Sequence, residues 1–464
     1  MTAATTAKHR PAPTALTRGQ ARHLLSRTGF AATAAAIDAV AGLDRETAIA
    51  RLLDAAAARS LAGAATPPPA WTVAWSPPQT AAMSEVERLA LRNSLREQGR
   101  DLKGWWLREM LETPAPLTEV MTLFWHNHFT TSLAKVKAPA LLYGQNALLR
   151  RHALGSFATL LREIARDPAM LLYLDNARSR RRAPNENFAR ELFELFTLGE
   201  GRYAESDLQA AARAFTGWSV DPDSGSFRFR AAWHDDSEKS IFGRNGRFGG
   251  DEVIELLLAR PETADLIVAK LWRQFIAEQP EPGEAARLAA IFRRGDYEIR
   301  PLLLALLTSD AFWAAENRGR LVKSPVDLTA GTLRLFALPA GDTRDLAWLC
   351  RRLGQDLFEP PDVKGWPGGT AWITGASLLD RQAFISRITG GTDAAEPADA
   401  KQRERRRAAF FDRWVAGLPA AWQEADAMTR LLLPLAPVDA AVLDRQASGA
   451  LVRHLLADPV YHLK

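Results

Sequence analysis

Two histidines stand two residues apart in the stretch FWHNHF, at residues 124–129. An imidazole can hold a divalent metal ion or move a proton, so His126 and His128 are candidate metal ligands. The preceding residues have a helical pattern, and positions i and i+2 of a helix diverge by about 200°. Both rings can reach one ion only if the helix ends there; otherwise one of them points elsewhere. In projection His128 falls on the apolar side, where a buried, hydrogen-bonded ring is the alternative to a ligand.

A second candidate is the helix predicted in PNENFARELFELF, at residues 184–196. At about 100° per residue, its leucines and phenylalanines share one arc and its polar side chains share the other. The polar arc carries Glu186, Asn187, Arg190, Glu191 and Glu194. If that arc faces solvent, its ion pairs contribute a few tenths of a kcal/mol each. If it faces a cleft, Glu191 and Glu194 are candidate metal ligands or acid–base groups, Arg190 would orient a carboxylate, and Asn187 would bind substrate.

A third candidate lies in the polar run WHDDSEK, at residues 233–239. Here His234 is a candidate metal ligand, Asp235 a candidate catalytic carboxylate and Lys239 a candidate binding residue. The alternative is a solvated turn, because short runs of His and Asp are common in loops.

The segment FEPPDVKGWPGGTAW, at residues 358–372, concentrates proline, glycine and tryptophan. This composition predicts a rigid aromatic corner. Trp366 is a candidate for lining a binding groove there.

The elements that must position these residues read as helices. Helical patterns cover residues from Thr17 past 25, 44–59, 84–112, 116–129, 143–174, 185–198, 205–217, 250–259, 262–277, 283–294, 299–314, 325–336, 342–355 and 376–389. Thr17 is a candidate helix cap, and Pro116 suits the first turn of its helix. Phe227 and Phe229 alternate with arginines, which predicts one small β-hairpin inserted at 224–243. The sequence therefore predicts a mainly α fold, an irregular array of many helices.

The predicted organisation is one large helical domain at 17–388 with a proline-rich connector at 63–80. A flexible N-terminus at 1–16 precedes this domain. A linker at 389–402 follows it and leads to a C-terminal helical segment at 403–464, which we expect to pack on the main domain.

Composition narrows the function classes. The chain has 464 residues and a net charge of +5, which spread over that length is a weak field and argues against a nucleic-acid partner. Cys350 is the single cysteine, which excludes an intramolecular disulfide and a thiolate zinc cluster. No apolar run is long enough to cross a membrane and no signal sequence is recognisable, so the default expectation is a cytoplasmic protein. GxSxG, HExxH, phosphate-loop and dinucleotide motifs are absent from the sequence.

Five segments of the chain resemble one bacterial family, catalogued as domain of unknown function eighteen hundred. They are HLLSRTGF near the start, FWHNHF, PNENFARELFELFTLGEGRYAESDLQAAARAFTGW, FRFRAAWHDDSEK and LFEPPDVKGWPGGTAW, in this order. The resemblance implies no activity and no catalytic residues. It implies frequent export, from which this chain departs by lacking a signal sequence, and a possible partner from a sulfatase-like family encoded nearby.

We hypothesise an enzyme, with hydrolysis preferred over oxidation because the di-iron signature Glu-x-x-His is missing. In this hypothesis a divalent metal ion is bound by His126 or His128, Glu191 and His234, with Glu194, Arg190 and Asp235 beside it. The alternative hypothesis is a non-enzymatic helical platform that holds a partner protein or a polymer.

Overall fold

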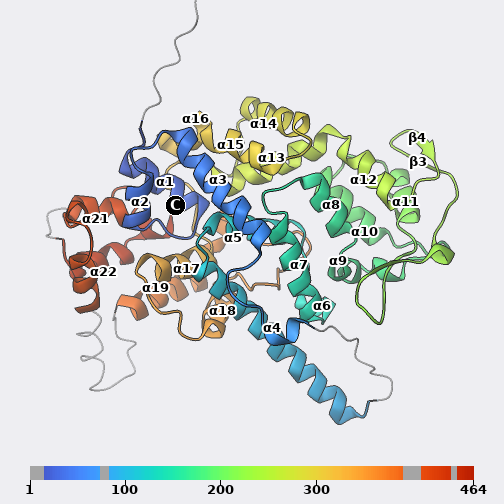
Figure 1. The fold of residues 1–464 in the computed structure, drawn as a ribbon, viewed down its shortest axis with the longest axis horizontal. Coiled ribbons are helices and arrows are strands. Elements are labelled where there is room, and N and C mark those ends of the chain that lie inside the picture. The colour runs from blue at the N-terminus through green and yellow to red at the C-terminus, as the bar shows by residue number, and fades with distance from the viewer. Residues whose placement is uncertain (1–14, 74–82, 390–408, 440, 442–446) are drawn as a thin grey trace, which may run out of the picture.

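The computed structural model describes residues 15–73, 83–389, 409–439, 441 and 447–464. Within them the chain is mainly α-helical, as the sequence predicts, with two small antiparallel sheets (Figure 1). Among the described residues, no helix has the length and apolar character that crossing a membrane requires.

The helices of the first half are α1 (Arg18–Thr28), α2 (Ala34–Val40), α3 (Arg45–Ala62), η1 (Ala70–Val73), α4 (Glu85–Glu112), α5 (Pro116–His128), α6 (Leu133–Val136), α7 (Pro139–Arg151), α8 (Phe157–Ala165), α9 (Pro168–Tyr173), η3 (Asn176–Arg178), α10 (Glu186–Glu191), η4 (Leu192–Thr197) and α11 (Glu205–Ala214). The strands are β1 (Trp218–Val220), β2 (Phe227–Phe229), β3 (Lys239–Ile241) and β4 (Arg244–Gly246), with η5 (Ala231–Trp233) between β2 and β3.

The later helices are α12 (Gly250–Leu258), α13 (Pro261–Phe275), α14 (Pro282–Arg294), α15 (Ile299–Thr308), α16 (Asp310–Trp313), η6 (Ala315–Asn317), α17 (Pro325–Leu335), α18 (Thr343–Arg352), η7 (Gly369–Trp372), α19 (Gly375–Thr389), η8 (Ala420–Trp422), α21 (Ala425–Leu432), α22 (Gly449–Ala457) and η10 (Pro459–His462). The helical pattern predicted at 143–174 is thus divided among α7, α8 and α9, because turns near residues 152–156 and 166–167 separate them.

Helices begin where the sequence supplies a cap. The Thr17 hydroxyl accepts a hydrogen bond from the Gln20 amide at 3.2 Å, and the Gln20 side chain accepts one from the Thr17 amide at 3.0 Å. This reciprocal pair satisfies two backbone donors that the first turn leaves free. Pro116 occupies the first turn of α5, where its missing N–H costs nothing. Both predicted helix starts are therefore confirmed.

The β-structure is more than the one hairpin expected at 224–243. Strand β1 pairs with β2, with Trp218 opposite Phe229, and β3 pairs with β4, with Lys239 opposite Gly246. The first hairpin begins at Trp218, before the expected range, because the strand of Phe227 and Phe229 pairs with β1, which follows α11, and not with residues 239–241.

Buried apolar side chains form two clusters. The larger cluster spans most of the chain between Leu16 and Trp372. The smaller one joins the C-terminal helices α21 and α22 to α1, α2, α17 and α19, and these elements lie together at one end of the molecule (Figure 1). Leu16 is buried and Ala15 pairs with Asp44, although the flexible N-terminus was expected to reach residue 16. The rest of that terminus, the connector at 74–80 and the linker at 390–402 lie outside the described residues, and the domain division stays a prediction.

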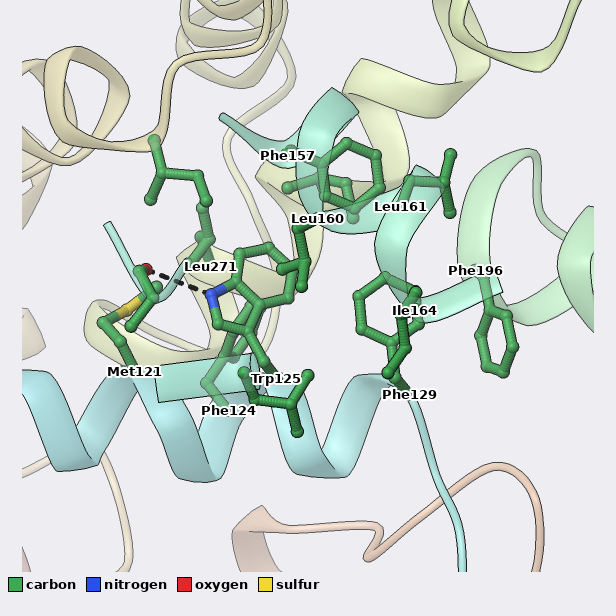
Figure 2. Packing of buried hydrophobic residues seen from close by; sticks show 14 of the residues in the cluster. Met121, Phe124, Trp125, Phe129, Phe157, Leu160, Leu161, Ile164, Phe196 and Leu271 are labelled. Carbon is green, nitrogen blue, oxygen red and sulfur yellow. Dashed lines mark hydrogen bonds between the residues drawn. The ribbon is translucent and has the colours of Figure 1, made fainter. Parts of the chain in front are cut away.

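Helix α5 is held in place by a buried ion pair. The Arg150 guanidinium of α7 donates two hydrogen bonds to the Glu119 carboxylate, at 2.6 and 2.8 Å, and the Trp106 indole of α4 donates a third at 2.8 Å. A buried ion pair of this kind is favourable only when its polar atoms are satisfied, as they are here. Trp125 lies one turn before the end of α5. Its indole donates a hydrogen bond to the Ala153 carbonyl at 3.1 Å, and its ring packs among the side chains of α8 (Figure 2).

Helix α1 is tied to segments that follow much later in the chain. Arg27 is fully buried and donates to the carbonyls of Phe275 and Ile276, each at 3.1 Å, and to that of Asn317. Arg22 donates to the carbonyls of the last two residues of α21, at 2.9 and 3.0 Å. These contacts satisfy carbonyls at helix ends that no backbone amide reaches.

Candidate functional site

The two imidazoles of FWHNHF lie in different surroundings at the end of α5. The His126 ring is buried among aromatic rings, with centroids at 5.2 Å for Trp106, 5.1 Å for Phe358 and 5.8 Å for Trp366. Its Nε2 has no hydrogen-bond partner among the described residues. Burial lowers the pKa of His126 to about 3, so this ring is neutral at ordinary pH.

The His128 ring faces the opposite direction, toward α8, η4 and α13. It packs against Phe196 with ring centroids at 5.8 Å. Phe196 also packs on Phe129, with ring centroids at 5.1 Å, and these two rings are labelled in Figure 2. Its Nδ1 accepts a hydrogen bond from the Lys270 ammonium at 2.8 Å. Burial, and then the positive charge of Lys270, lower the pKa of His128 well below its usual value. His128 is thus a neutral acceptor for a lysine.

Lys270 connects the first two candidate segments of the sequence. It extends from α13, and besides His128 it donates to the Leu195 carbonyl at 2.9 Å. Leu195 belongs to η4, a π-helical turn in which the Leu198 amide bonds to the Phe193 carbonyl five residues earlier. Short π-helical turns of this kind often occur at functional sites. The lysine therefore bridges the end of FWHNHF and the end of PNENFARELFELF.

Burial changes the protonation of Lys270. Desolvation, and next the charge of Arg273, lower the pKa of Lys270 to about 7. Among the described residues it has no ion-pair partner, so no carboxylate raises its pKa. At neutral pH the neutral and charged forms are both populated.

Lys270 and His128 line a cleft of about 260 Å³ between α5, α13 and the segment 364–372. The opposite wall is fixed by Asn127, whose side chain accepts from the Trp366 amide at 2.7 Å and donates to the Trp366 carbonyl at 3.2 Å. Gly365 has φ +84°, and a Cβ there would lie 2.3 Å from the Asn127 Oδ1. Only glycine permits this approach. Trp366 is buried and lines the cleft, and its role as a binding residue stays a prediction.

Half of the charged residues that line the cleft are in ion pairs. Lys464 pairs with Asp327 at 2.7 Å, and Lys364 pairs with Glu200 at 2.8 Å. Within the described part of the chain, Lys270 and Arg273 make no ion pair. Glu278 also lines the cleft and makes no ion pair with a described residue, so the unpaired groups are one carboxylate and two cations, one of which is partly neutral at pH 7.

The polar arc of α10 and η4 lies beside this cleft. Arg190 pairs with Glu186 at 3.4 Å, Glu194 at 3.8 Å and Glu205 at 3.0 Å, and Glu194 accepts a hydrogen bond from Tyr203. These contacts are largely exposed and contribute little to stability. Burial, and next the charge of Glu194, raise the pKa of Glu191, while Arg190 and the cleft residue Lys364 lower it.

Asn187 has a structural role in the start of α10. Its amide nitrogen donates to the Leu174 carbonyl at 3.3 Å, and its backbone N–H donates to the Asn185 cap at 2.9 Å. Its role as a substrate-binding residue stays a prediction.

The HDD run forms a separate cluster near α11. Arg213 pairs with Asp235 at 2.8 Å, and this bond is the main reason why the pKa of Asp235 lies far below its usual value. The His234 Nδ1 lies 2.8 Å from the Thr216 carbonyl, and Lys239, which is buried, donates to the carbonyls of Asp235 and Ser237. Each of the predicted groups here has a partner within the cluster.

The donors predicted for a metal ion do not converge. His126 lies among aromatic rings, the His128 Nδ1 is bonded to a lysine and the His234 Nδ1 to a backbone carbonyl. No group of three or more His, Cys, Asp or Glu side chains in the described ranges is arranged to hold a metal ion. The donor set therefore does not fit the ion, and metal binding stays a prediction of the sequence alone.

Sequence reasoning missed Lys270. The residue stands in the amphipathic run LIVAKLWRQF, where its position next to apolar residues is the only available signal. Its partners lie more than seventy residues away, on α5 and η4. A long-range contact of this kind has no local signature in the sequence.

The segments that carry the resemblance meet around the cleft: FWHNHF, the end of PNENFARELFELF and the KGWPGG corner supply its walls or hold its lysine. In comparisons with known proteins, the model of the family described as "Protein of unknown function (DUF1800)" matches residues 23–463. No curated protein and no solved structure matches the chain. Because the family model covers nearly all of its length, the chain belongs to the DUF1800 family of proteins of unknown function.

Proposed function

We propose that the chain is an enzyme and that the cleft lined by Lys270 and His128 is its active site. The observation that carries this proposal is the 2.8 Å hydrogen bond between the Lys270 Nζ and the His128 Nδ1. Two basic groups share this bond, without an acid to pair with either one among the described residues. A titratable pair that is perturbed by burial and opens into a cleft is characteristic of functional sites.

The proposed role of Lys270 is that of a general base. Two of its N–H groups are directed to His128 and to the Leu195 carbonyl. In the neutral amine the remaining tetrahedral position is a lone pair, which is free to accept a proton. In the tautomer that carries its proton on Nε2, the His128 Nδ1 accepts this bond and the ring holds the amine in one orientation. A base with a pKa of about 7 suits proton transfer at neutral pH.

The proposed substrate is a small molecule that carries a negative charge. Arg273 is exposed at the cleft, without an ion-pair partner in the described residues, and lies one turn from Lys270 on α13. An anionic group bound by Arg273 would lie beside the amine and would offset the positive charge of the cleft.

The proposed reaction is hydrolysis of an ester or amide. Lys270 takes a proton from a water molecule, whose oxygen forms a bond to the substrate carbonyl carbon. The ammonium then returns the proton to the leaving oxygen or nitrogen as the bond from that atom to the carbonyl carbon breaks. No step of the reaction depends on a metal ion. Glu191, Glu194 and Asp235 have no part in it, and their predicted catalytic roles remain untested.

The alternative function is a non-enzymatic platform that holds a partner. The feature that favours it is the aromatic corner, where Trp366 donates one hydrogen bond to the Asn127 side chain and accepts another from it, and Trp372 also lines the cleft. The sulfatase-like partner implied by the family resemblance belongs to this alternative. Purifying both proteins together and testing for a complex by gel filtration would examine it.

The experiment that tests the enzyme proposal measures the ionisation of Lys270 and its contribution to turnover. Competitive labelling with acetic anhydride, followed by peptide mass spectrometry, gives the pH at which each lysine becomes reactive. We expect Lys270 to become reactive near pH 7, well below the value of about 10.4 for a lysine in a model peptide. A panel of anionic esters and amides is then assayed with the wild type, Lys270→Met and Lys135→Met.

The expected result is turnover that falls on the order of 10²- to 10⁴-fold in Lys270→Met and is unchanged in Lys135→Met. A reactive Lys270 with no turnover of any substrate would favour the platform over the enzyme. An ordinary ionisation of Lys270, near pH 10, would refute its role as a base.

A further inference from the structure

The first half of α4 extends beyond the rest of the molecule (Figure 1). Residues 84–97 are mostly exposed, including Val86 at 77% and Leu89 at 50%. A helix this long without packing is only marginally stable in water. The capping box of Ser84 and Glu87 supports its start, but capping contributes only about 1 kcal/mol.

One face of this helix is basic along its length. Arg92, Arg96 and Arg100 follow one another at intervals of four, so they form a single line of guanidinium groups, which Arg88 extends by one turn. Arg100 pairs with Glu97 of the same helix at 2.5 Å. Arg88, Arg92 and Arg96 make no ion pair with any described residue. Three cations at one-turn spacing repel one another unless negative charge is supplied from outside.

The same face forms a wall of a groove of about 550 Å³. Its floor is apolar and is made by Leu95 and Gly99 of α4 with Leu133, Ala134 and Pro139 from the following elements. The rim adds Lys103, Lys137 and Arg351, and among the described lining residues Glu359 is the single carboxylate. The groove thus presents a row of arginines, spaced one helical turn apart, along an apolar floor.

We propose that this groove docks an acidic amphipathic helix of a partner protein. Carboxylates at positions i, i+4 and i+8 of such a helix would meet Arg92, Arg96 and Arg100, and its apolar face would cover Leu95 and Leu133. The apolar floor distinguishes this partner from nucleic acid, whose contacts would be made mainly through phosphates. This surface lies on α4 and α6 and shares no lining residue with the cleft of Lys270.

The test measures binding of a synthetic helical peptide to the full chain by fluorescence anisotropy. The peptide carries glutamate at every fourth position on one face and leucine on the opposite edge, and polyglutamate of equal charge is the non-helical comparison at neutral pH. The variant Arg92→Glu/Arg96→Glu reverses the charge of the groove. Its matched control, Arg51→Glu/Arg244→Glu, changes the net charge equally at exposed positions outside the groove.

We expect the peptide to bind the wild type and the control, and binding to weaken at least about 10-fold in the groove variant. A second variant, Leu95→Asn, should weaken binding of the amphipathic peptide several-fold and leave binding of polyglutamate unchanged. Circular dichroism verifies that α4 stays helical in each variant. Equal binding of peptide to the groove variant and the control would refute the proposal, as would a 20-base-pair DNA duplex or vesicles of anionic lipid binding the groove more tightly than the peptide.

Discussion

The cleft at the end of α5 and the cluster at the hairpins contain similar residue types. They differ in whether their charged groups have partners of opposite charge. Around Asp235 the carboxylate, the guanidinium of Arg213 and the ammonium of Lys239 all have partners within the cluster. Around Lys270 a buried amine is bonded to a neutral imidazole and a carbonyl, and no described carboxylate pairs with it. Paired charges stabilise a fold, whereas a buried group kept from its preferred charge state costs stability and is retained where function requires it.

The largest expected effect comes from the turn that forms the wall of the cleft. Gly365→Ala places a Cβ against the Asn127 side chain at a residue with φ +84°, so we expect a loss of about 3 kcal/mol in the free energy of unfolding. The matched control is Gly243→Ala in the hairpin region, which has φ +73° and open space around the new Cβ. It should cost about 1 kcal/mol. Urea denaturation compares them, and equal losses would show that contact with Asn127 is unimportant.

The next effect is the pH dependence conferred by Lys270. Its folded pKa of about 7 lies below that of an unfolded lysine, so the unfolded state binds more protons between pH 7 and about 10.5. The wild type should therefore gain stability relative to Lys270→Met as pH rises through this window, by up to about 1.4 kcal/mol for each pH unit. Thermal or urea unfolding at several pH values measures the difference. Lys135→Met, at an exposed position, controls for the loss of one positive charge, and a flat difference for Lys270→Met would contradict its low pKa.

Asp235 should show the same direction of pH dependence in a more acidic window, but for the opposite reason, because the folded state favours its charged form. Its pKa is lowered in the folded state, so its contribution is present above the unfolded value of about 4 and is lost as pH falls below it. Because the pair with Arg213 is partly exposed, Asp235→Asn should cost only about 1 kcal/mol at pH 7. Asp236→Asn, at the exposed neighbouring position, should cost less. A large loss of turnover in Asp235→Asn without a loss of stability would move catalytic importance to the hairpins.

The smallest effect is expected at His126. The Nε2 of this ring is buried and has no hydrogen-bond partner in the described part of the chain, so replacing the ring by leucine should change the free energy of unfolding by less than about 1 kcal/mol. His128→Leu removes the acceptor of Lys270 and should cost about 1 to 2 kcal/mol. Differential scanning calorimetry of both variants measures the two effects. Loss of bound metal in His126→Leu would restore the metal-site hypothesis.

Periodicity in the sequence was enough to predict the mainly helical fold, and Thr17 and Pro116 marked helix starts correctly. The helical projection also indicated that His126 and His128 point apart and that His128 lies on the apolar side. These features depend on residues close together in the chain.

Which residues form the candidate site could be predicted from the sequence only in part. The π-helical turn of η4 directs the Leu195 carbonyl toward α13, and nothing in LFELFT distinguishes this turn from an ordinary helix. Lys270 is buried only because α13 packs on that turn. The second hairpin was also missed, because its three-residue strands are too short to show alternation.

The buried arginines of α1 have a consequence for biosynthesis. Arg27 requires carbonyls at residues 275, 276 and 317, and Arg22 requires those at 431 and 432. On a ribosome, the first helix emerges hundreds of residues before its acceptors exist. Final docking of α1 must therefore wait until α21 has left the exit tunnel, which makes closure of the structure a late, post-synthetic event and exposes the early helices to chaperones in the interval.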